Sequence, residues 1–220
     1  RRFGAATSWT DILRADLPVA YNGLKAAARE IGGVQIQASG TIGGNLCTAS
    51  PAGDSIPCLM TLNAAIELAS RRGARRLPLN EFLTGPRQTA CAPDELVTAV
   101  YVPSDAEMGV GGFEKLGARR YLVISIAMTA ARLSIADGRI GDAAISVGAC
   151  APVAVRLTEL EAGLRGMAYD MAGDFIRASR SGIMAALSPI DDVRGTAGYR
   201  RDAAAEIVAR LVERLCGEFG

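Results

Sequence analysis

The stretch from Thr41 to Pro57, TIGGNLCTASPAGDSIP, holds more small hydrogen-bonding groups than a turn needs. Its adjacent glycines, Gly43 and Gly44, precede Asn45. Successive backbone N–H groups in a glycine turn can converge on an anion, and glycine lets a phosphate approach the backbone without a Cβ in the way. Four side chains would add hydrogen-bond donors: Thr41, Asn45, Thr48 and Ser50. The spacing alone leaves a plain turn and an anion or cofactor site equally open.

Two charged residues could bind a ligand, and each also has a structural interpretation. Asp54 precedes an apolar segment that starts like a helix, where aspartate is a favoured N-cap, and it could instead accept hydrogen bonds from ligand hydroxyls. Lys115 lies in GGFEKLG on an expected strand, and strand alternation would direct it to solvent. The pair Arg119 and Arg120 is expected at a turn, either in solvent or against a partner.

The composition excludes several classes of chemistry. The chain of 220 residues has no histidine, which excludes Ser-His-Asp and Cys-His catalysis and histidine metal sites. Its five cysteines form no CxxC pair, so neither a zinc site nor an iron–sulfur cluster is indicated. Scattered cysteines are typical of buried positions in a reducing compartment, which predicts a cytoplasmic protein. The chemistry must come from backbone amides, carboxylates, hydroxyls and a bound cofactor.

Charge and hydropathy limit the partners. The formal net charge is +1, so we expect no nucleic-acid partner. The longest apolar run, from Tyr121 to Ala131, is well short of the roughly 20 residues that a membrane-spanning helix needs. We therefore expect no membrane span.

The first half of the chain is expected to mix helices and strands around these residues. Asp16 and Pro18 predict the start of a helix that ends near Ile31, before Gly32 and Gly33. The glycine stretch is expected as a loop. The pattern further predicts a strand over 34–37, a helix over 56–62, a hairpin with strands at 64–69 and 77–79, and a strand over 95–102 that is apolar on both faces.

The second half begins after a loop over 103–112, a candidate subdomain boundary. The pattern predicts strands over 113–116, 124–135 and 140–147, the last two turning at Asp137-Gly138. Helices follow over 155–164, 171–187 and 202–215, the last with an apolar stripe expected to pack on the core. This order predicts an α+β fold rather than βαβ alternation. The glycine stretch therefore lacks the strand–GxGxxG–helix setting of a dinucleotide-binding fold, and it lacks the GK[ST] of a P-loop.

Several stretches in order resemble the flavoprotein subunits of the molybdenum hydroxylases, which include xanthine dehydrogenase, carbon monoxide dehydrogenase and nicotinate dehydrogenase. TIGGNLCTASPAGD resembles the family's FAD-binding motif, and the other stretches are FGAATSWTDI, IGGVQIQASGTIGGN, APDELVTAVYVP, FEKLGARRYLVISIAM and SPIDDVRGTAGYRRDAA. The resemblance implies an α+β fold. Residues 1–106 would form the second part of a FAD-binding domain of the vanillyl-alcohol-oxidase/molybdopterin-dehydrogenase type. Residues 107–220 would form a small C-terminal flavoprotein domain of antiparallel strands followed by helices.

The resemblance also implies a set of FAD-binding residues, with no catalytic acid, base or nucleophile and no metal ligand among them. The pyrophosphate would be wrapped by the backbone amides of Thr41, Ile42, Gly43, Gly44 and Asn45, with Thr48 beside it. Asp54 would accept hydrogen bonds from the polyol or ribose hydroxyls. Ile31 would pack on the cofactor, Val97 would sit against the flavin rings, and Lys115 would lie near the flavin.

The function that the resemblance implies is that of an electron-transfer subunit of an oxidoreductase. The molybdenum cofactor would lie on a large partner subunit and 2Fe-2S clusters on a small one, and FAD in this subunit would pass electrons to NAD+ or another acceptor. The lack of clustered cysteines argues against the family branch with an extra iron–sulfur loop in this subunit. Replacement of Lys115 by alanine is then expected to change acceptor reduction more than stability.

Subunits of this family begin with a further small α/β subdomain, whose glycine-rich loop binds the other side of the pyrophosphate. We expect that subdomain to precede residue 1, on the same polypeptide or on a separate chain, so that half of the phosphate cradle lies outside these residues. The alternative function is a truncated or non-flavin scaffold that only assembles with the molybdenum and iron–sulfur subunits. A flavoenzyme acting alone is a third possibility, which the lack of histidine and of an obvious general base disfavours.

Overall fold

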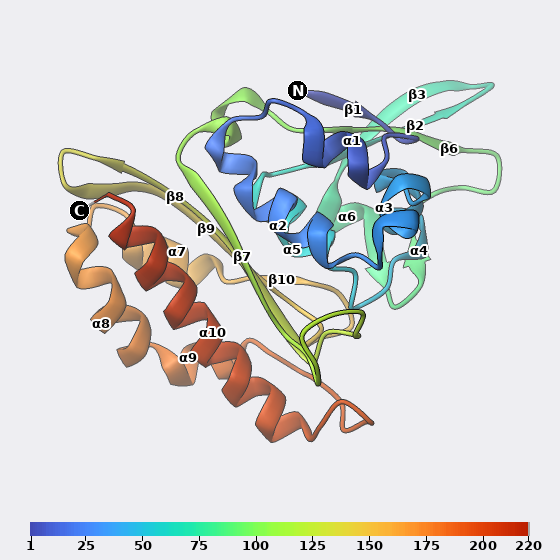
Figure 1. Cartoon of the computed structure of the whole chain (residues 1–220). Coiled ribbons are helices and arrows are strands. Elements are labelled where there is room, and N and C mark those ends of the chain that lie inside the picture. The colour runs from blue at the N-terminus through green and yellow to red at the C-terminus, as the bar shows by residue number, and fades with distance from the viewer. Residues whose placement is uncertain (220) are drawn as a thin grey trace.

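The structure is a computed structural model that describes residues 1–219, and most of their strands lie in two antiparallel sheets (Figure 1). The first sheet has the order β1 (Arg2–Gly4), β6 (Leu96–Tyr101), β2 (Ala65–Ser70), β3 (Gly73–Pro78). The second has the order β10 (Val155–Arg156), β9 (Arg139–Gly148), β8 (Ala127–Ala136), β7 (Val110–Leu116). A small pair joins β4 (Leu83–Gly85) to β5 (Gln88–Thr89). The expected α+β organisation is confirmed.

The helices of the first half are short and lie below the first sheet in Figure 1. They are α1 (Trp9–Arg14), the 3-10 turn η1 (Val19–Tyr21), α2 (Asn22–Glu30), α3 (Val34–Ser39), α4 (Ile42–Thr48), α5 (Ser55–Thr61), α6 (Leu79–Phe82) and the 3-10 turn η2 (Ser104–Glu107). A capping box between Ser8 and Asp11 starts α1, and Trp9 in its first turn is almost fully buried. The helix predicted to start near Asp16 starts later. After α1 ends at Arg14, the chain passes through η1, and α2 begins only at Asn22.

The helices of the second half follow its strands. They are α7 (Thr158–Leu164), the 3-10 turn η3 (Tyr169–Met171), α8 (Ala172–Ala178), α9 (Arg180–Ala185) and α10 (Ala197–Gly217). Thr196 caps α10 by accepting a hydrogen bond from the backbone N–H of Tyr199 at 3.2 Å. The predicted apolar stripe of α10 is confirmed, since Val208, Leu211 and Leu215 are buried on the side that packs on β7 and β8.

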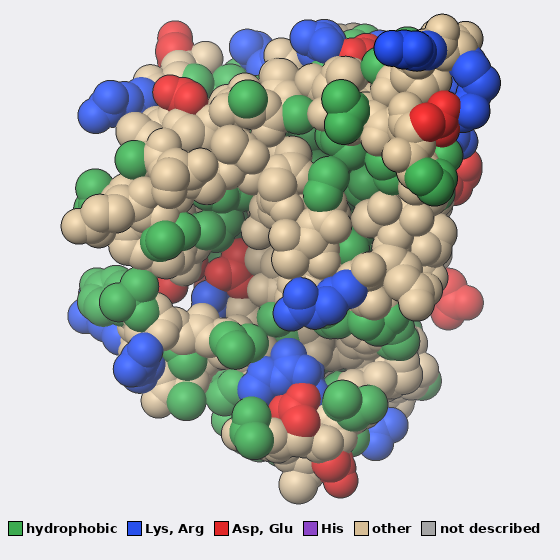
Figure 2. All heavy atoms as spheres, turned by 90° about the vertical axis from the view of Figure 1, so that its right-hand side faces the viewer, with side chains coloured by type: hydrophobic (Ala, Val, Ile, Leu, Met, Phe, Trp, Pro, Cys, Tyr) green, Lys and Arg blue, Asp and Glu red, His purple; other side chains and the backbone are tan. Residues whose placement is uncertain are grey.

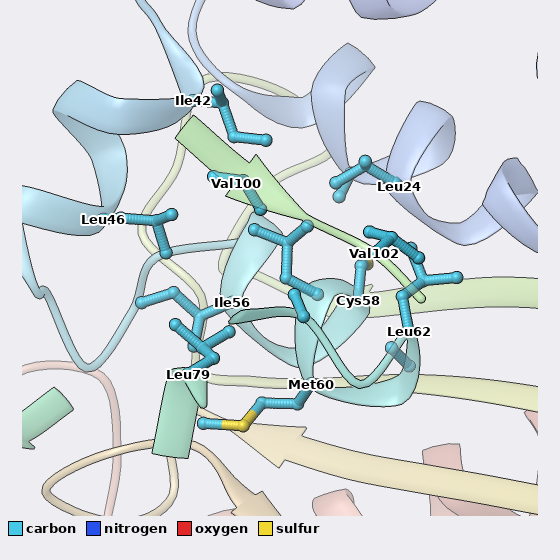
Figure 3. Packing of buried hydrophobic residues seen from close by; sticks show 14 of the residues in the cluster. Leu24, Ile42, Leu46, Ile56, Cys58, Met60, Leu62, Leu79, Val100 and Val102 are labelled. Atoms are coloured by element: carbon cyan, nitrogen blue, oxygen red, sulfur yellow. The ribbon is translucent and has the colours of Figure 1, made fainter. Parts of the chain in front are cut away.

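The central strand β8 lies between two layers of helices (Figure 1). Met128 and Ala130 pack in the core of the first half, whereas Ala131 and Leu133 pack with the C-terminal helices. This alternation is that of an extended strand with both faces buried. Figure 3 shows the first core around α5, whose side chains lie among labelled residues of α2, α4, α6 and β6, with Met60 beside Leu79.

Two arginines of the second half hold the C-terminal end of α5. Arg132, which is 1% exposed, donates from Nε to the carbonyl oxygen of Thr61 at 3.0 Å. Arg156 donates from Nη1 to the carbonyl oxygen of Met60 at 2.6 Å. Cations at a helix C-terminus satisfy carbonyls that have no partner within the helix and interact favourably with its dipole. The position of α5 is therefore fixed relative to the second sheet.

Several predicted elements are wrong in type or extent. Residues 34–37 form helix α3 and not a strand, because two apolar–polar alternations are too few to separate the two periods. The first part of the glycine stretch is not a loop, since Thr41 caps helix α4 over Ile42–Thr48, whereas residues 49–54 do form a loop. The long helix over 171–187 is divided at Ser179, whose ψ of 6° ends α8 before α9 begins. The helix over 155–164 begins only at Thr158, after the short strand β10.

Candidate functional site

Helix α4 carries most of the glycine stretch and begins with a side-chain cap. Thr41 has an extended backbone, and its Oγ1 accepts a hydrogen bond from the N–H of Gly44 at 3.0 Å. Thr48, one turn after Gly44, donates its hydroxyl to the Gly44 carbonyl at 2.8 Å. Thr41, Gly44 and Thr48 follow the helical repeat, so they lie on one side of α4.

The backbone amides of this first turn are already engaged within the chain. The N–H of Ile42 donates to the Thr7 carbonyl at 3.0 Å, and that of Gly43 donates to the Ala5 carbonyl at 2.9 Å. The N–H of Asn45 donates to the Thr41 carbonyl at 3.0 Å. The sequence predicted that free backbone amides of this stretch would surround an anion. In the structure these amides are engaged within the chain, because the stretch forms a helix that packs on the turn after β1. The groups that face outward are side chains and the bare Cα of Gly44.

The two adjacent glycines have different surroundings. A Cβ on buried Gly43 would lie 2.7 Å from the Cβ of Ala5, closer than real atoms approach. A Cβ on exposed Gly44 would meet, among the described residues, only Oγ1 of Thr41 at 3.0 Å. Gly43 is thus required for packing, whereas Gly44 leaves a flat place between the hydroxyls of Thr41 and Thr48. This open surface, which we call the α4 face (Thr41, Gly44, Asn45, Thr48), leaves the backbone at Gly44 without a covering Cβ.

A second group of predicted residues forms a buried cluster. Asp54, at the start of α5, accepts from Nζ of Lys115 at 2.6 Å and from Oγ of Ser125 at 2.6 Å. Both side chains of the ion pair are nearly closed to solvent, at 7% exposed for Asp54 and 8% for Lys115. Burial raises the pKa of the Asp54 carboxyl, and the Lys115 charge and the Ser125 hydroxyl oppose that rise. We call these three residues the Asp54 cluster.

Two structural interpretations from the sequence are corrected by this cluster. The Asp54 side chain makes no capping hydrogen bond to α5 within the described residues, because both of its oxygens point to the second half of the chain. Lys115 is not directed to solvent. Its strand β7 is covered by α2 on one side and by α10 on the other, so the ammonium group lies inside and requires a counter-charge.

The α4 face and the Asp54 cluster adjoin. Ser55, next to Asp54, donates its hydroxyl to Oδ1 of Asn45 at 2.8 Å. On the other side, Lys115 lines a cavity of about 420 Å³ together with Glu30 of α2 and Phe113 of β7. Arg119, Arg120 and Val123 from the loop after β7 close its rim. Figure 2 shows that this side of the molecule is hollowed between its upper and lower parts, with charged side chains in the hollow.

The remaining predicted residues lie near this group without joining its hydrogen bonds. Ile31 is the C-cap of α2 and directly follows Glu30, which lines the cavity. Ile42 is fully buried in the first core. Val97 is half-buried on β6, and α4 packs against this strand. The structure therefore brings the α4 face, the Asp54 cluster and the cavity together, with Ile31 at one border and Val97 at another.

Ser125 is the polar residue of this site that the sequence reasoning missed. It lies 71 positions from Asp54, and its hydroxyl is fully buried. A single serine before an apolar strand carries no spacing signal, so only the fold identifies it.

Within residues 1–219, no group of three or more His, Cys, Asp or Glu side chains is placed to hold a metal. No helix in the same residues has the length and apolarity to cross a membrane.

Two family models match consecutive parts of the chain. Residues 1–105 match the FAD binding domain in molybdopterin dehydrogenase. Residues 113–215 match the CO dehydrogenase flavoprotein C-terminal domain. The predicted order, a flavin-binding domain and then a C-terminal flavoprotein domain, is confirmed.

Curated relatives are similar over most of the chain. The nicotine 6-hydroxylase medium subunit of Paenarthrobacter nicotinovorans is 32% identical over 96% of this chain and 73% of its own length. The carbon monoxide dehydrogenase medium chain of Afipia carboxidovorans is 32% identical over 93% of this chain and 69% of its own. The xanthine dehydrogenase FAD-binding subunit of Escherichia coli O157:H7 is 31% identical over 73% of this chain and 56% of its own.

Solved structures agree with these relatives. A chain of the reconstituted CO dehydrogenase from Oligotropha carboxidovorans superimposes with a TM-score of 0.85 at 30% identity, over 98% of this chain and 75% of that one. A chain of carbon monoxide dehydrogenase from Hydrogenophaga pseudoflava gives a TM-score of 0.86 at 27% identity, over 96% and 73%. The similarity thus includes both halves of the fold.

Proposed function

Because this chain belongs to the family of FAD-binding subunits of the molybdenum hydroxylases, which are oxidoreductases, we propose that it transfers electrons through FAD. In this proposal, electrons arrive from 2Fe-2S clusters on a small partner subunit, after substrate oxidation at the molybdenum cofactor of a large one. They leave to NAD+ or another acceptor. We place the protein in the cytoplasm and the boundary between its domains at residues 106 and 107. The observation that carries the proposal is the open α4 face adjoining the Asp54 cluster.

The residues present fit a dinucleotide that carries a pyrophosphate. The α4 face offers the Thr41 hydroxyl and the side-chain NH2 of Asn45 around a position without a Cβ, and the Thr48 hydroxyl could join them by leaving the Gly44 carbonyl. We assign the pyrophosphate to this face. Side chains would bind it in place of most of the backbone amides that the sequence predicted. Ile42 and Gly43 serve by holding α4 against the turn after β1.

The Asp54 cluster and the cavity beside it are assigned to the ribityl and flavin part of the cofactor. FAD, when bound, supplies the redox chemistry. Asp54 offers its remaining lone pairs to hydroxyl groups, and Lys115 holds a positive charge at the cavity wall that Asp54 partly neutralises. Ile31 and Val97 contribute apolar contact at the two borders of the site.

The visible absorption spectrum of the complex purified with its partner subunits tests this proposal. We expect flavin bands and about one FAD for each copy of this chain. The variant Gly44→Val should remove the FAD, because its branched side chain would cover the place between Thr41 and Thr48. A wild-type complex without flavin bands contradicts the proposal, and stoichiometric FAD in Gly44→Val contradicts the placement of the pyrophosphate.

A scaffold without flavin is the second candidate, and one observation favours it. All four backbone amides from Ile42 to Asn45 donate within the chain, so they offer little to a phosphate. This candidate predicts a complex that assembles fully, has no flavin absorbance, and is unchanged in composition by Gly44→Val. The same spectrum therefore separates the two functions.

A further inference from the structure

The segment that leads into α10 belongs to a stretch that the proposed function leaves without a role. It is SPIDDVRGTAGYRRDAA, one of the stretches that resemble the family, and it contains Asp192 and Arg200. Arg200 lies at the end of the first turn of α10 and is 1% exposed. A cation near a helix N-terminus interacts unfavourably with the helix dipole, and burial of its charge costs further free energy. The stability of α10 itself therefore does not explain this side chain.

The Arg200 guanidinium donates to backbone carbonyls of three separate segments. Nε donates to Ile126 at 3.1 Å, Nη1 donates to Ile190 at 2.8 Å, and Nη2 donates to Ala149. Asp192 is the counter-charge, with its Oδ2 at 3.4 Å from Nη1. Figure 1 shows the start of α10 at the lower end of the molecule, close to where β8 begins. The planar fork of a guanidinium fixes the direction of these hydrogen bonds, which the ammonium of a lysine does not.

Ile126 connects Arg200 to two members of the Asp54 cluster. It directly follows Ser125, whose hydroxyl donates to the carboxylate of the cluster at 2.6 Å. Its own N–H donates at 2.8 Å to the carbonyl of Leu116, the residue after Lys115. The hydrogen bond that holds the Ile126 carbonyl therefore also holds the backbone from which Ser125 and Lys115 reach the cluster.

Ala149 connects Arg200 to the third member of the cluster. Its N–H donates at 2.9 Å to the carbonyl of Pro51, in the loop over residues 49–54 that ends at Asp54. Ala149 has a φ of +63°, a left-handed conformation that is unfavourable for alanine and persists only where the surroundings hold it. Its hydrogen bonds to Pro51 on one side and to Arg200 on the other supply that hold.

We propose that Arg200 is a positioning residue for the FAD site, which sets the geometry of the Asp54 cluster through Ile126 and Ala149. This inference rests on the proposed function, in which FAD binds beside that cluster. Without the guanidinium, the two buried carbonyls would lose a charged donor, and the start of β8 and the end of β9 would be held less firmly. The pairing of Asp54 with Lys115 would then loosen, although Arg200 makes no hydrogen bond to either residue within residues 1–219.

The lysines of this chain report on the cluster directly, because there are only two of them, Lys25 and Lys115. The complex purified with its partner subunits is treated with sulfosuccinimidyl acetate, and acetylation of both lysines is followed by mass spectrometry. Lys115 is 8% exposed and paired with Asp54, so its acetylation should be slow. Lys25 binds the Ala15 carbonyl outside the cluster and serves as the internal reference. Arg200→Met should raise the rate ratio of Lys115 to Lys25 by about tenfold or more.

Arg132→Met is the matched control. Arg132 is also 1% exposed and also donates to backbone carbonyls, but it lies on β8 four residues beyond Met128, the register partner of Lys115. Both variants lose a buried arginine and should be destabilised in urea to a similar extent. In Arg132→Met the ratio of Lys115 to Lys25 should nevertheless stay within about twofold of wild type.

Arg200→Lys keeps the question open to test if Arg200→Met does not fold. It retains the charge and most of the side chain, but an ammonium cannot hold the carbonyls of Ile126 and Ala149 with the geometry of the fork. Its ratio of Lys115 to Lys25 should lie between those of wild type and Arg200→Met. The FAD dissociation constant should follow the same order, with a rise of about tenfold in Arg200→Met and less than about twofold in Arg132→Met.

The outcomes separate this inference from the proposed function. An unchanged ratio of Lys115 to Lys25 in the Arg200 variants overturns the inference. An equal rise in Arg132→Met also overturns it, because Arg200 would then contribute only to general stability. A wild-type complex without flavin contradicts the proposed function, and the ratio still decides whether Arg200 positions the cluster. A flavin-loaded complex whose ratio and FAD affinity do not respond to Arg200→Met contradicts this inference alone.

Discussion

The α4 face and the Asp54 cluster are neighbours built in opposite ways. The α4 face comes from one seven-residue helix and its cap, and it is open to solvent. The Asp54 cluster joins residues 61 and 71 positions apart, and it is closed to solvent. One surface is made by local sequence and the other by tertiary packing.

This difference predicts different consequences of substitution. Side chains on an open helix face contribute little to folding, so changes there should alter ligand binding and leave stability almost unchanged. A buried ion pair behaves otherwise, because the removal of one partner leaves an uncompensated charge in a medium that solvates it poorly. The variants below test this contrast, from the largest expected effect to the smallest.

Lys115→Ala should be the most destabilising of these substitutions. It leaves the buried Asp54 carboxylate with the Ser125 hydroxyl as its side-chain partner among the described residues, and the free energy of unfolding should fall by about 3–5 kcal/mol. The earlier expectation of a small effect on stability assumed a lysine in solvent, which the structure corrects. Urea unfolding at neutral pH measures the change.

The double variant Lys115→Ala/Asp54→Asn is the control for that charge effect. The amide carries no charge, so part of the lost stability should return, and a double-mutant cycle should give a coupling well above zero. Wild-type stability in Lys115→Ala alone would show that the pair is not closed in solution, and the contrast between the two regions would fail.

Gly43→Ala should destabilise the fold although it lies in the glycine motif. The new methyl group would lie 2.7 Å from the Cβ of Ala5, and forcing this overlap costs about 2 kcal/mol. The measurement is the shift in thermal midpoint. Gly43→Ala combined with Ala5→Gly should recover only part of the stability, because the second change removes the Ala5 Cβ but leaves the Ala5 carbonyl oxygen, which is also 2.7 Å from the new methyl group. A stable Gly43→Ala single variant would place Gly43 with the open face instead.

Much of the fold was predictable because its signals are local. The hairpin of β8 and β9 follows from Asp137-Gly138 between two apolar runs, and the stripe of α10 follows from its helical spacing. The type of α3 was not predictable, because Val34 and Ile36 are both exposed and so give no core-facing period. The helical state of α4 was also missed, since two glycines disfavour a helix by themselves. The Thr41 cap, the contact with Ala5 and the burial of Ile42 and Leu46 hold it.

Several residues of the candidate site could be named from the sequence, but the contacts between them could not. The family motif named Asp54 and Lys115, but their contact depends on the packing of β7 between α2 and α10. Ser125 could not be named, since its role arises from a position beside Asp54 that no spacing encodes. The distinct roles of Gly43 and Gly44 likewise depend on Ala5, which is outside the motif.

Ser125→Ala should change how stability depends on pH. Burial raises the pKa of Asp54 in the folded state, so the stability linked to this group is full below its unfolded pKa of about 3.9 and declines as pH rises through the folded pKa. Loss of the Ser125 donor removes a hydrogen bond to the charged form, which raises that pKa further and moves the decline to higher pH. At neutral pH the variant should be less stable by about 1.5 kcal/mol.

Urea unfolding from acid to neutral pH measures this effect, and Ser146→Ala provides a matched control. Ser146 is also fully buried, and its hydroxyl has no hydrogen-bond partner within residues 1–219. Its removal should therefore cost little at any pH. If the two variants gave the same pH profile, the Ser125 hydroxyl would contribute no more than an ordinary buried serine.

Gly44→Ala should have the smallest effect on folding and the opposite sign. Among the described residues the methyl group would meet only Oγ1 of Thr41, at 3.0 Å, a side-chain atom that must shift by a few tenths of an ångström. With that shift, alanine in place of glycine within a helix stabilises it by about 0.5–1 kcal/mol. FAD content should nevertheless fall, because the same methyl group covers the flat place on the α4 face. A variant that is more stable and also holds less FAD separates folding from binding at this position, which Gly44→Val alone cannot do. A variant that is less stable would mean that Gly44, like Gly43, is required for packing, and the α4 face would then lose its defining residue.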